Sequence, residues 1–286
     1  MSFPESPEVR YQMLRPAQIV ARREACPAAY IPLGNVEWHG VQNPLGADTL
    51  QAEGIAIRAA QKGGGLVMPP LWYFAPDHEM TGYIERGRDA IAREMHLPPE
   101  NFMLTNDPAQ VRTANERYQQ MLVDMLLLAE TLGFSVGILV AGHYPLIAHA
   151  IAAVIQFATL RSHDPARTRR PGLDLIPWAC CEPVLRYQLE NLAHVGDHGG
   201  YWETSNVMAM YPQTVDLAAL GPAGEPQVGI GGSRPPHEAN AADGRQHIEA
   251  CADLMIREVK VRIEHPDWFR HAAFTMAQGK WKQDAV

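Results

Sequence analysis

Carboxylate and imidazole side chains gather in one short segment near the start of the chain. The sequence GNVEWHG over residues 34–40 holds Glu37 and His39, and Asp48 follows nine residues after His39. Glu37 and His39 are two positions apart, so an extended backbone points both side chains to the same side. Carboxylate oxygens together with imidazole nitrogens suit a divalent ion such as Zn²⁺, Mn²⁺ or Fe²⁺. The segment therefore predicts metal ligands.

Two later segments supply further candidates at the ends of apolar elements. His143 follows the apolar run SVGILV beside Gly142, where a ligand at the carboxyl edge of a sheet would lie. The sequence HGGYWETS contains His198, and it contains Glu203 at the start of an expected helix. A set of this kind could hold one or two divalent ions, with Asp48 shared between them. A histidine that is not a ligand could protonate a departing amine.

Each of these residues also has an ordinary structural explanation. Asp48 is placed where an N-cap would be, and Glu203 is placed where a first-turn carboxylate faces the helix dipole. His143 could be a hydrogen-bonded core histidine, and His198 a loop imidazole in a glycine-rich turn. Because all of them lie at the ends of elements, we favour the metal site over four separate explanations.

Composition limits the functional classes. The chain has 286 residues, 47% of them hydrophobic, and a net charge of −8, and this length suffices for one large α/β domain or two small ones. The acidic balance argues against a nucleic-acid surface. The four cysteines show no CxxC spacing, which predicts reduced thiols in a cytoplasmic protein. We find no signal-peptide pattern and no apolar run of membrane-spanning length, so we expect no membrane partner.

Strand-like and helix-like segments alternate along the chain, which predicts a parallel or mixed sheet covered by helices. We expect a single domain over residues 1–286, with a polar insertion at about 85–113 that serves as a lid or as a contact between subunits. The expected strands are 27–33, 66–70, 135–140 and 171–178, and the expected helices are 48–61, 114–132, 146–160, 204–211 and 247–263.

Three segments together resemble the signatures of the creatininase (creatinine amidohydrolase) family. They are GNVEWHG with the following GADT, the strand that ends in GH at residues 142–143, and HGGYWETS. The resemblance covers about residues 28–217. It implies an α/β three-layer sandwich with a mostly parallel sheet flanked by helices. It also implies a divalent-metal site, cleavage of a carbon–nitrogen bond in an amide or cyclic amide, and often a hexamer.

The resemblance also assigns roles to residues of this chain. Asp48 is the bridging metal ligand, and His198 is a catalytic or substrate-contacting histidine. The metal ligands that the resemblance implies are Glu37, His39, Asp48 and His143.

The chain departs from the family pattern close to these residues. Creatininase proper has a glutamate two residues after the matching histidine, where this chain has Pro145. A proline side chain cannot bind a metal, so Glu203 is the candidate for the fifth ligand.

The asparagine that usually precedes Gly142 is Ala141 here. The usual Gly-Thr pair reads Gly82-Tyr83, and extra residues follow at about 90–107. Together with Ala141, these changes surround the substrate and not the metal, and we therefore expect a substrate other than creatinine.

The leading hypothesis is a metal-dependent amidohydrolase with one or two Zn, Mn or Fe ions per chain and a small amide, formamide or cyclic amide as substrate. His198 and Glu203 are the predicted catalytic residues. Aromatic side chains near the motifs could stack on a flat ring, although ordinary packing explains any one of them slightly better. The predicted substrate-binding residues are Trp38, His78, Tyr144 and Trp202.

Two other functional classes stay open. A metal-dependent lyase, dehydratase or isomerase is the first, because Pro145 could leave a single ion that polarises a carbonyl. A non-catalytic, metal-stabilised binding subunit is the second, since Ala141 and Pro145 replace polar residues of the family. By the resemblance we expect a homo-oligomer, with a small molecule as the other partner.

Overall fold

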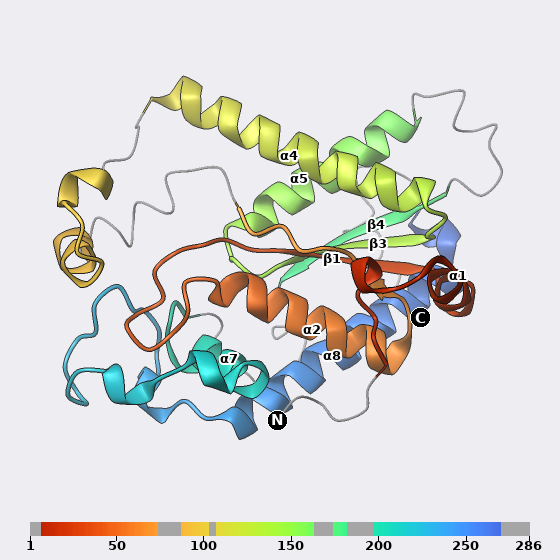
Figure 1. Cartoon of the computed structure of the whole chain (residues 1–286). Coiled ribbons are helices and arrows are strands. Elements are labelled where there is room, and N and C mark those ends of the chain that lie inside the picture. Colours follow the sequence, from red (N-terminus) through yellow and green to blue (C-terminus); the bar gives the residue numbers. More distant parts are fainter. Residues whose placement is uncertain (1–6, 74–86, 103–106, 163–173, 182–196, 270–286) are drawn as a thin grey trace.

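A parallel sheet of four strands forms the middle layer of the molecule (Figure 1). The computed structural model describes residues 7–73, 87–102, 107–162, 174–181 and 197–269. The strands lie in the order β2-β1-β3-β4, and neighbouring strands are parallel. All carboxyl ends therefore meet at one edge of the sheet. The strands are β1 (Ala28–Leu33), β2 (Leu66–Val67), β3 (Val136–Ala141) and β4 (Ile176–Cys181).

Helices cover both faces of the sheet (Figure 1). On one face lie α2 (Ala47–Gly63) and α8 (Ala241–Glu264), and α7 (Tyr201–Met210) packs against both. On the other face lie α4 (Pro108–Thr131) and α5 (Leu146–Ser162). The short helix α1 (Pro16–Ala25) lies beside β2. The predicted three-layer α/β sandwich is confirmed.

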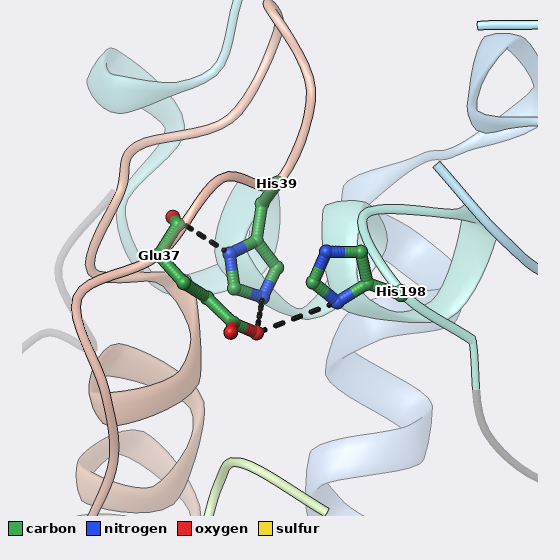
Figure 2. A group of neighbouring side chains, drawn as sticks. All are labelled: Glu37, His39 and His198. Carbon is green, nitrogen blue, oxygen red and sulfur yellow. Dashed lines mark hydrogen bonds and ion pairs between the residues drawn. The ribbon is translucent and has the colours of Figure 1, made fainter. Parts of the chain in front are cut away.

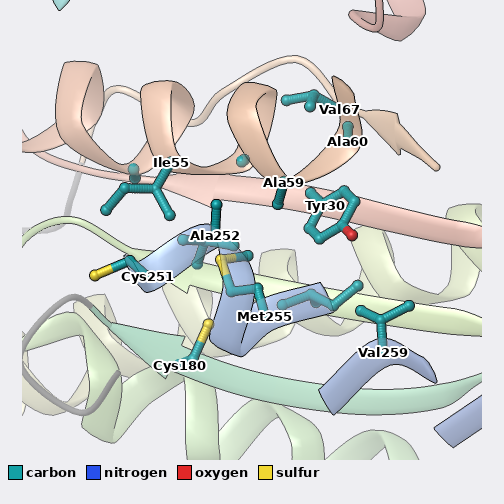
Figure 3. Packing of buried hydrophobic residues seen from close by; sticks show 14 of the residues in the cluster. Tyr30, Ile55, Ala59, Ala60, Val67, Cys180, Cys251, Ala252, Met255 and Val259 are labelled. Atoms are coloured by element: carbon teal, nitrogen blue, oxygen red, sulfur yellow. The ribbon is translucent and has the colours of Figure 1, made fainter. Parts of the chain in front are cut away.

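Alternation along β1 explains why both faces are covered. Tyr30 is buried in the cluster formed with α2 and α8, whereas Ile31 is buried in the cluster formed with α4 and α5. Successive side chains of a strand point to opposite faces, so a strand that is apolar throughout must be buried on both. Figure 3 shows the first cluster, in which Met255 and Val259 of α8 lie near Tyr30.

Several predicted boundaries are wrong, each for a local reason. The strand expected at 66–70 has only two residues, because Pro69 and Pro70 have no N–H groups to donate to a sheet. The strand expected at 171–178 runs from Ile176 to Cys181, in register with β3, and residues 171–173 lie outside the described residues.

The helices expected at 114–132, 204–211 and 247–263 begin earlier than predicted. Polar side chains accept hydrogen bonds from first-turn N–H groups and so extend each helix beyond its apolar pattern. Asp107 accepts one from Ala109, and Asn240 accepts one from Asp243.

The described part of the predicted insertion contains a short helix, which lies near Val228 and Gly229. Residues 87–94 are helical, and α4 begins inside the predicted range. The Ile91 side chain is buried and packs beside Gly229. The roles of this segment as a lid or subunit contact, and the single-domain organisation, stay predictions. No helix in the described part of the chain is both long and apolar enough to cross a membrane.

Candidate metal centre

The carboxyl edge of the sheet brings the predicted site residues together. The loop after β1 carries Glu37 and His39, and His143 follows β3 in the same way. Asp48 lies in the first turn of α2. The loop before α7 carries His198, and the first turn of that helix carries Glu203. Side chains that the chain separates by up to 166 positions thus converge on one place.

Asp48 lies at the centre of this group. It does not cap its helix, because the N-cap position belongs to Gly46, which caps without a side chain. Its Oδ1 lies 3.0 Å from Nε2 of His39, and its Oδ2 lies 3.2 Å from Nδ1 of His143. One carboxylate therefore presents one oxygen to each of two imidazoles.

Two groups of possible ligands share Asp48. The first triad is Glu37, Asp48 and His143, in which Nδ1 of His143 lies 3.1 Å from Oε1 of Glu37. The second triad is His39, Asp48 and Glu203, in which Nε2 of His39 lies 3.5 Å from Oε2 of Glu203. Within each triad the possible ligand atoms lie no more than 4.8 Å from one another.

His198 faces the carboxylate of Glu37, together with His39 (Figure 2). Its Nδ1 lies 3.4 Å from Oε1 of Glu37, and its Nε2 lies 2.7 Å from the carbonyl oxygen of Trp38. A carbonyl oxygen only accepts, so Nε2 of His198 carries a hydrogen and donates it to Trp38. In the neutral ring, Nδ1 then presents a lone pair to the centre.

Glycine lets the backbone approach the site closely at two points. A Cβ added to Gly142 would lie 1.9 Å from the carbonyl oxygen of Asp48. Gly199 has a φ of +59°, and a Cβ there would lie 2.6 Å from the carbonyl oxygen of His39. Only glycine fits such close approaches without a shift of the backbone.

Burial and neighbouring charges shift the pKa values of His39, His143 and Asp48 in opposite directions. Burial alone would lower the pKa of both ligand histidines, but the carboxylates around them outweigh it. The pKa of His39 rises to about 10 through Asp48 and Glu203, and that of His143 to about 11 through Asp48 and Glu37. His39 and His143 in turn hold the pKa of Asp48 well below its usual range, against the effect of burial.

The other two site residues shift because of burial itself. Burial raises the pKa of Glu203 to about 8, although the charge of His39 opposes this rise. Burial and then the charge of His39 lower the pKa of His198 to about 4.

The donor set fits divalent cations. Three carboxylates and two imidazoles converge in a buried place, where His39 is 0% and Asp48 1% exposed. Carboxylates this close together need positive charge between them, which the protonated imidazoles of His39 and His143 supply here and which a divalent cation would supply in their place. Oxygen and nitrogen ligands of this kind suit Zn²⁺, Mn²⁺ or Fe²⁺. Each triad is therefore a candidate group for holding a divalent ion, and Asp48 belongs to both.

The predicted substrate-binding residues differ in exposure and surroundings, and their roles stay predictions. Trp38 is half-buried and donates its indole N–H to the carbonyl oxygen of Val228 at 2.8 Å. Tyr144, directly after His143, is 62% exposed. Trp202 is half-buried, with its ring centroid 5.2 Å from that of His247. His78 lies outside the described residues.

Sequence reasoning missed several polar residues that hold the site in place. Both carboxylate oxygens of Asp197 accept N–H bonds from the first turn of α7, at 2.6 Å from Trp202 and 3.2 Å from Glu203. Gln51 donates to Oε1 of Glu203 at 3.2 Å. One signal was available, because Gln51 lies three positions after Asp48 and so on the same helix face.

The sequence family described as "Creatininase: creatinine amidohydrolase" matches residues 12–259 of the chain. No curated protein matches the chain.

Several solved structures share the fold. A chain named "Creatininase Mn" is 21% identical, with a TM-score of 0.62 over 91% of this chain and 100% of that one. A mutant creatininase complexed with creatine gives the same identity of 21%, TM-score of 0.62 and coverage of 91% and 100%. A creatinine amidohydrolase (creatininase) is 20% identical, with a TM-score of 0.63 over 91% of this chain and 99% of that one. Each of these likenesses covers 91% of this chain.

Proposed function

The chain belongs to the creatininase family, and on that premise we propose that it is a metal-dependent amidohydrolase. The single observation that carries the proposal is the position of Asp48, whose two oxygens face different triads at 3.0 and 3.2 Å. A pair of divalent ions held there would acidify a water molecule and polarise the carbonyl of an amide. The proposed reaction is hydrolysis of a carbon–nitrogen bond.

Each triad has a defined part in this proposal. Glu37 and His143 would hold one ion, and His39 and Glu203 would hold the other, with Asp48 bridging. Pro145 offers no ligand, and Glu203 stands in the second triad, which supports its role as the fifth ligand. Zinc, manganese or iron would suit these donors; related structures named for manganese and for a zinc pair support the first two.

His198 is the proposed proton carrier. Because Trp38 fixes the hydrogen on Nε2, the proton must be exchanged at Nδ1, the nitrogen that faces Glu37. There it would take a proton from the attacking water and deliver it to the departing nitrogen.

The proposed substrate is a small amide, formamide or cyclic amide other than creatinine. Ala141 supports this choice, because it removes a polar contact beside the centre without removing a ligand. Tyr144 and Trp202 are the aromatic side chains proposed to contact a flat substrate.

We also propose a cytoplasmic homo-oligomer, a hexamer by family resemblance. The four cysteines lie in the described part of the chain and form no disulfide, which supports a reducing compartment. Large apolar side chains are exposed on two neighbouring helices, which supports contacts between subunits. They are Met121 and Leu128 of α4 and Ile155 and Leu160 of α5.

Metal content by elemental analysis tests the proposal, on protein purified without chelator. We expect about two ions per chain in the wild type and about one in Glu203→Gln. Activity would be measured on formamides, lactams and short amides in ¹⁸O-labelled water. Incorporation of the label into the product supports hydrolysis. Turnover without incorporation, together with one ion per chain, would replace the proposal with a mononuclear lyase or isomerase.

A further inference from the structure

A chain of hydrogen bonds leads from Glu203 away from the metal centre into the core. Gln51 of α2 donates to Oε1 of Glu203 at 3.2 Å, and Asn206 of α7 donates to Oε1 of Gln51 at 2.8 Å. Nδ1 of His247 in α8 lies 2.9 Å from Oδ1 of Asn206. Sγ of Cys251 lies 3.4 Å from Nε2 of the same ring. We call Gln51, Asn206 and His247 the amide relay.

Helix periodicity places the relay behind the site. Asn206 follows Glu203 by three positions and so lies on the same face of α7. Cys251 follows His247 by four positions on α8. All members of the relay are at most 5% exposed. Polar groups buried this deeply are costly unless they are bonded, so each bond constrains the next.

The direction of the relay follows from its first member. As a metal ligand Glu203 must be ionised and can only accept, so Gln51 turns its NH₂ group to Glu203 and its oxygen to Asn206. Asn206 must then turn its NH₂ group to Gln51 and its oxygen to His247. The ring nitrogen that faces this oxygen must carry a hydrogen. The other ring nitrogen is therefore the acceptor, and Cys251 donates its S–H to it.

The relay occupies one oxygen of Glu203 and leaves the other for the centre. Oε1 is bonded to Gln51, whereas Oε2 accepts the N–H of Gly199 at 2.7 Å and lies 3.5 Å from Nε2 of His39. Two donors on different elements thus fix the plane of the carboxylate.

We propose that the amide relay positions Glu203 as a one-oxygen ligand, so that the affinity of the second ion depends on the relay and the affinity of the first does not. This inference rests on the proposed two-ion function. Groups that orient a metal ligand from behind change metal affinity by about 10–100-fold when they are removed. The first triad, by contrast, receives none of the relay's hydrogen bonds given above.

Manganese titration of the full-length, chelator-stripped protein tests the proposal. Electron paramagnetic resonance separates the first, mononuclear Mn²⁺ from the spin-coupled pair and so gives two dissociation constants. In Gln51→Met we expect the second constant to rise by about 10–100-fold and the first to stay as in the wild type. His247→Phe should have the same effect, weaker because it acts through two amides, and His247→Gln should restore the second constant by keeping a donor for Asn206.

The opposite face of the sheet offers a matched control. Gln119 of α4 also joins an imidazole and an amide, with Nε2 3.1 Å from Nδ1 of His149 and Oε1 accepting from Gln156 at 3.0 Å. Gln119→Met removes a comparable pair of bonds, and we expect both manganese constants to stay unchanged.

Three results would overturn the inference, and they are distinguishable. Two ions in the wild type with an unchanged second constant in Gln51→Met would remove the relay's role and leave the proposed function intact. If Gln51→Met and Gln119→Met both weakened the binding of the first and the second Mn²⁺ equally, the relay would contribute only to general stability. One ion in the wild type would contradict the two-ion function itself, and the relay's role with it.

Discussion

The two faces of the sheet bury similar polar groups with different outcomes. Between α4 and α5, Gln119 bonds to His149 and Gln156, and the bonds given for this cluster stay within the two helices. Between α2, α7 and α8, the amide relay makes the same kinds of bond, but it ends on Glu203. The relay amides are buried, whereas Gln119 and Gln156 are half-buried beside the buried His149, and loss of either arrangement would cost stability.

The difference between these two clusters shows when buried polar side chains indicate a functional site. An amide bonded to an imidazole is explained by packing alone, as the α4–α5 face demonstrates. The α2–α7–α8 face adds converging carboxylates that repel one another without a cation. The connection to charge at the carboxyl edge of the sheet, and not the burial of polar groups itself, distinguishes the functional face.

The largest expected effect is a loss of metal, and it distinguishes Asp48, in the first turn of α2, from Asp107, the N-cap of α4 on the opposite face. Asp48→Asn should reduce the metal content from about two ions per chain to none and abolish turnover, because both triads lose a charged oxygen. Asp107 caps α4 by accepting the N–H of Ala109 at 3.0 Å. Asp107→Asn should keep metal, turnover and stability, since asparagine caps as well as aspartate. Elemental analysis and activity measurements on both variants check this.

If Asp48→Asn retained two ions, the proposed difference between Asp48 and Asp107 would be wrong. Such retention would show that the triads are not joined through this carboxylate, and the bridging role would have to be abandoned.

The next largest effect is a loss of turnover, and it distinguishes His198 from His149 on the opposite face. His198→Ala should lower turnover by about 10²–10⁴-fold while the metal content stays the same, because it removes the proposed proton carrier. His149→Ala should leave turnover unchanged and lower the free energy of unfolding by about 1–3 kcal/mol, because Gln119 loses its buried partner. Steady-state rates, elemental analysis and denaturant unfolding separate the two.

The alternative for His198 has a distinct signature. Since Glu37, His39 and His198 also form a possible ligand group, a lower ion content in His198→Ala would make this histidine a ligand.

The convergence at the sheet edge was predictable, because it depends on short-range signals. Two apolar strands lead into site residues, because Glu37 and His39 lie in the loop after β1 and His143 lies two positions after β3, and parallel strands must end at one edge. The amide relay was not predictable in this way. Gln51 and Asn206 are 155 positions apart, and only the packing of α7 against α2 and α8 brings them together. The early start of α7 was missed for a related reason, since Asp197 bonds to its first turn from outside the helix.

The smallest expected effect compares two buried carboxylates, Glu53 of α2 and Glu130 of α4, which are 9% and 2% exposed. Burial raises the pKa of Glu53 above its ordinary value of 4.5, and Arg10 only partly offsets this. The folded protein therefore binds this proton more tightly than the unfolded chain. Glu53 contributes most to stability below pH 4.5, and this contribution is lost as the pH rises through the raised pKa.

Glutamine does not ionise, so Glu53→Gln should equal the wild type near pH 4 and exceed its Tm at pH 7 by roughly 1–3 °C. Glu130 differs because its Oε1 accepts the backbone N–H of Leu175 at 3.4 Å. Glu130→Gln can still present an amide oxygen to that N–H and should not raise the Tm. Thermal unfolding of both variants from pH 4 to 8 measures the contrast. A Tm of Glu53→Gln that follows the wild type at every pH would mean that the two faces hold their buried carboxylates alike, and only the metal centre would then distinguish them.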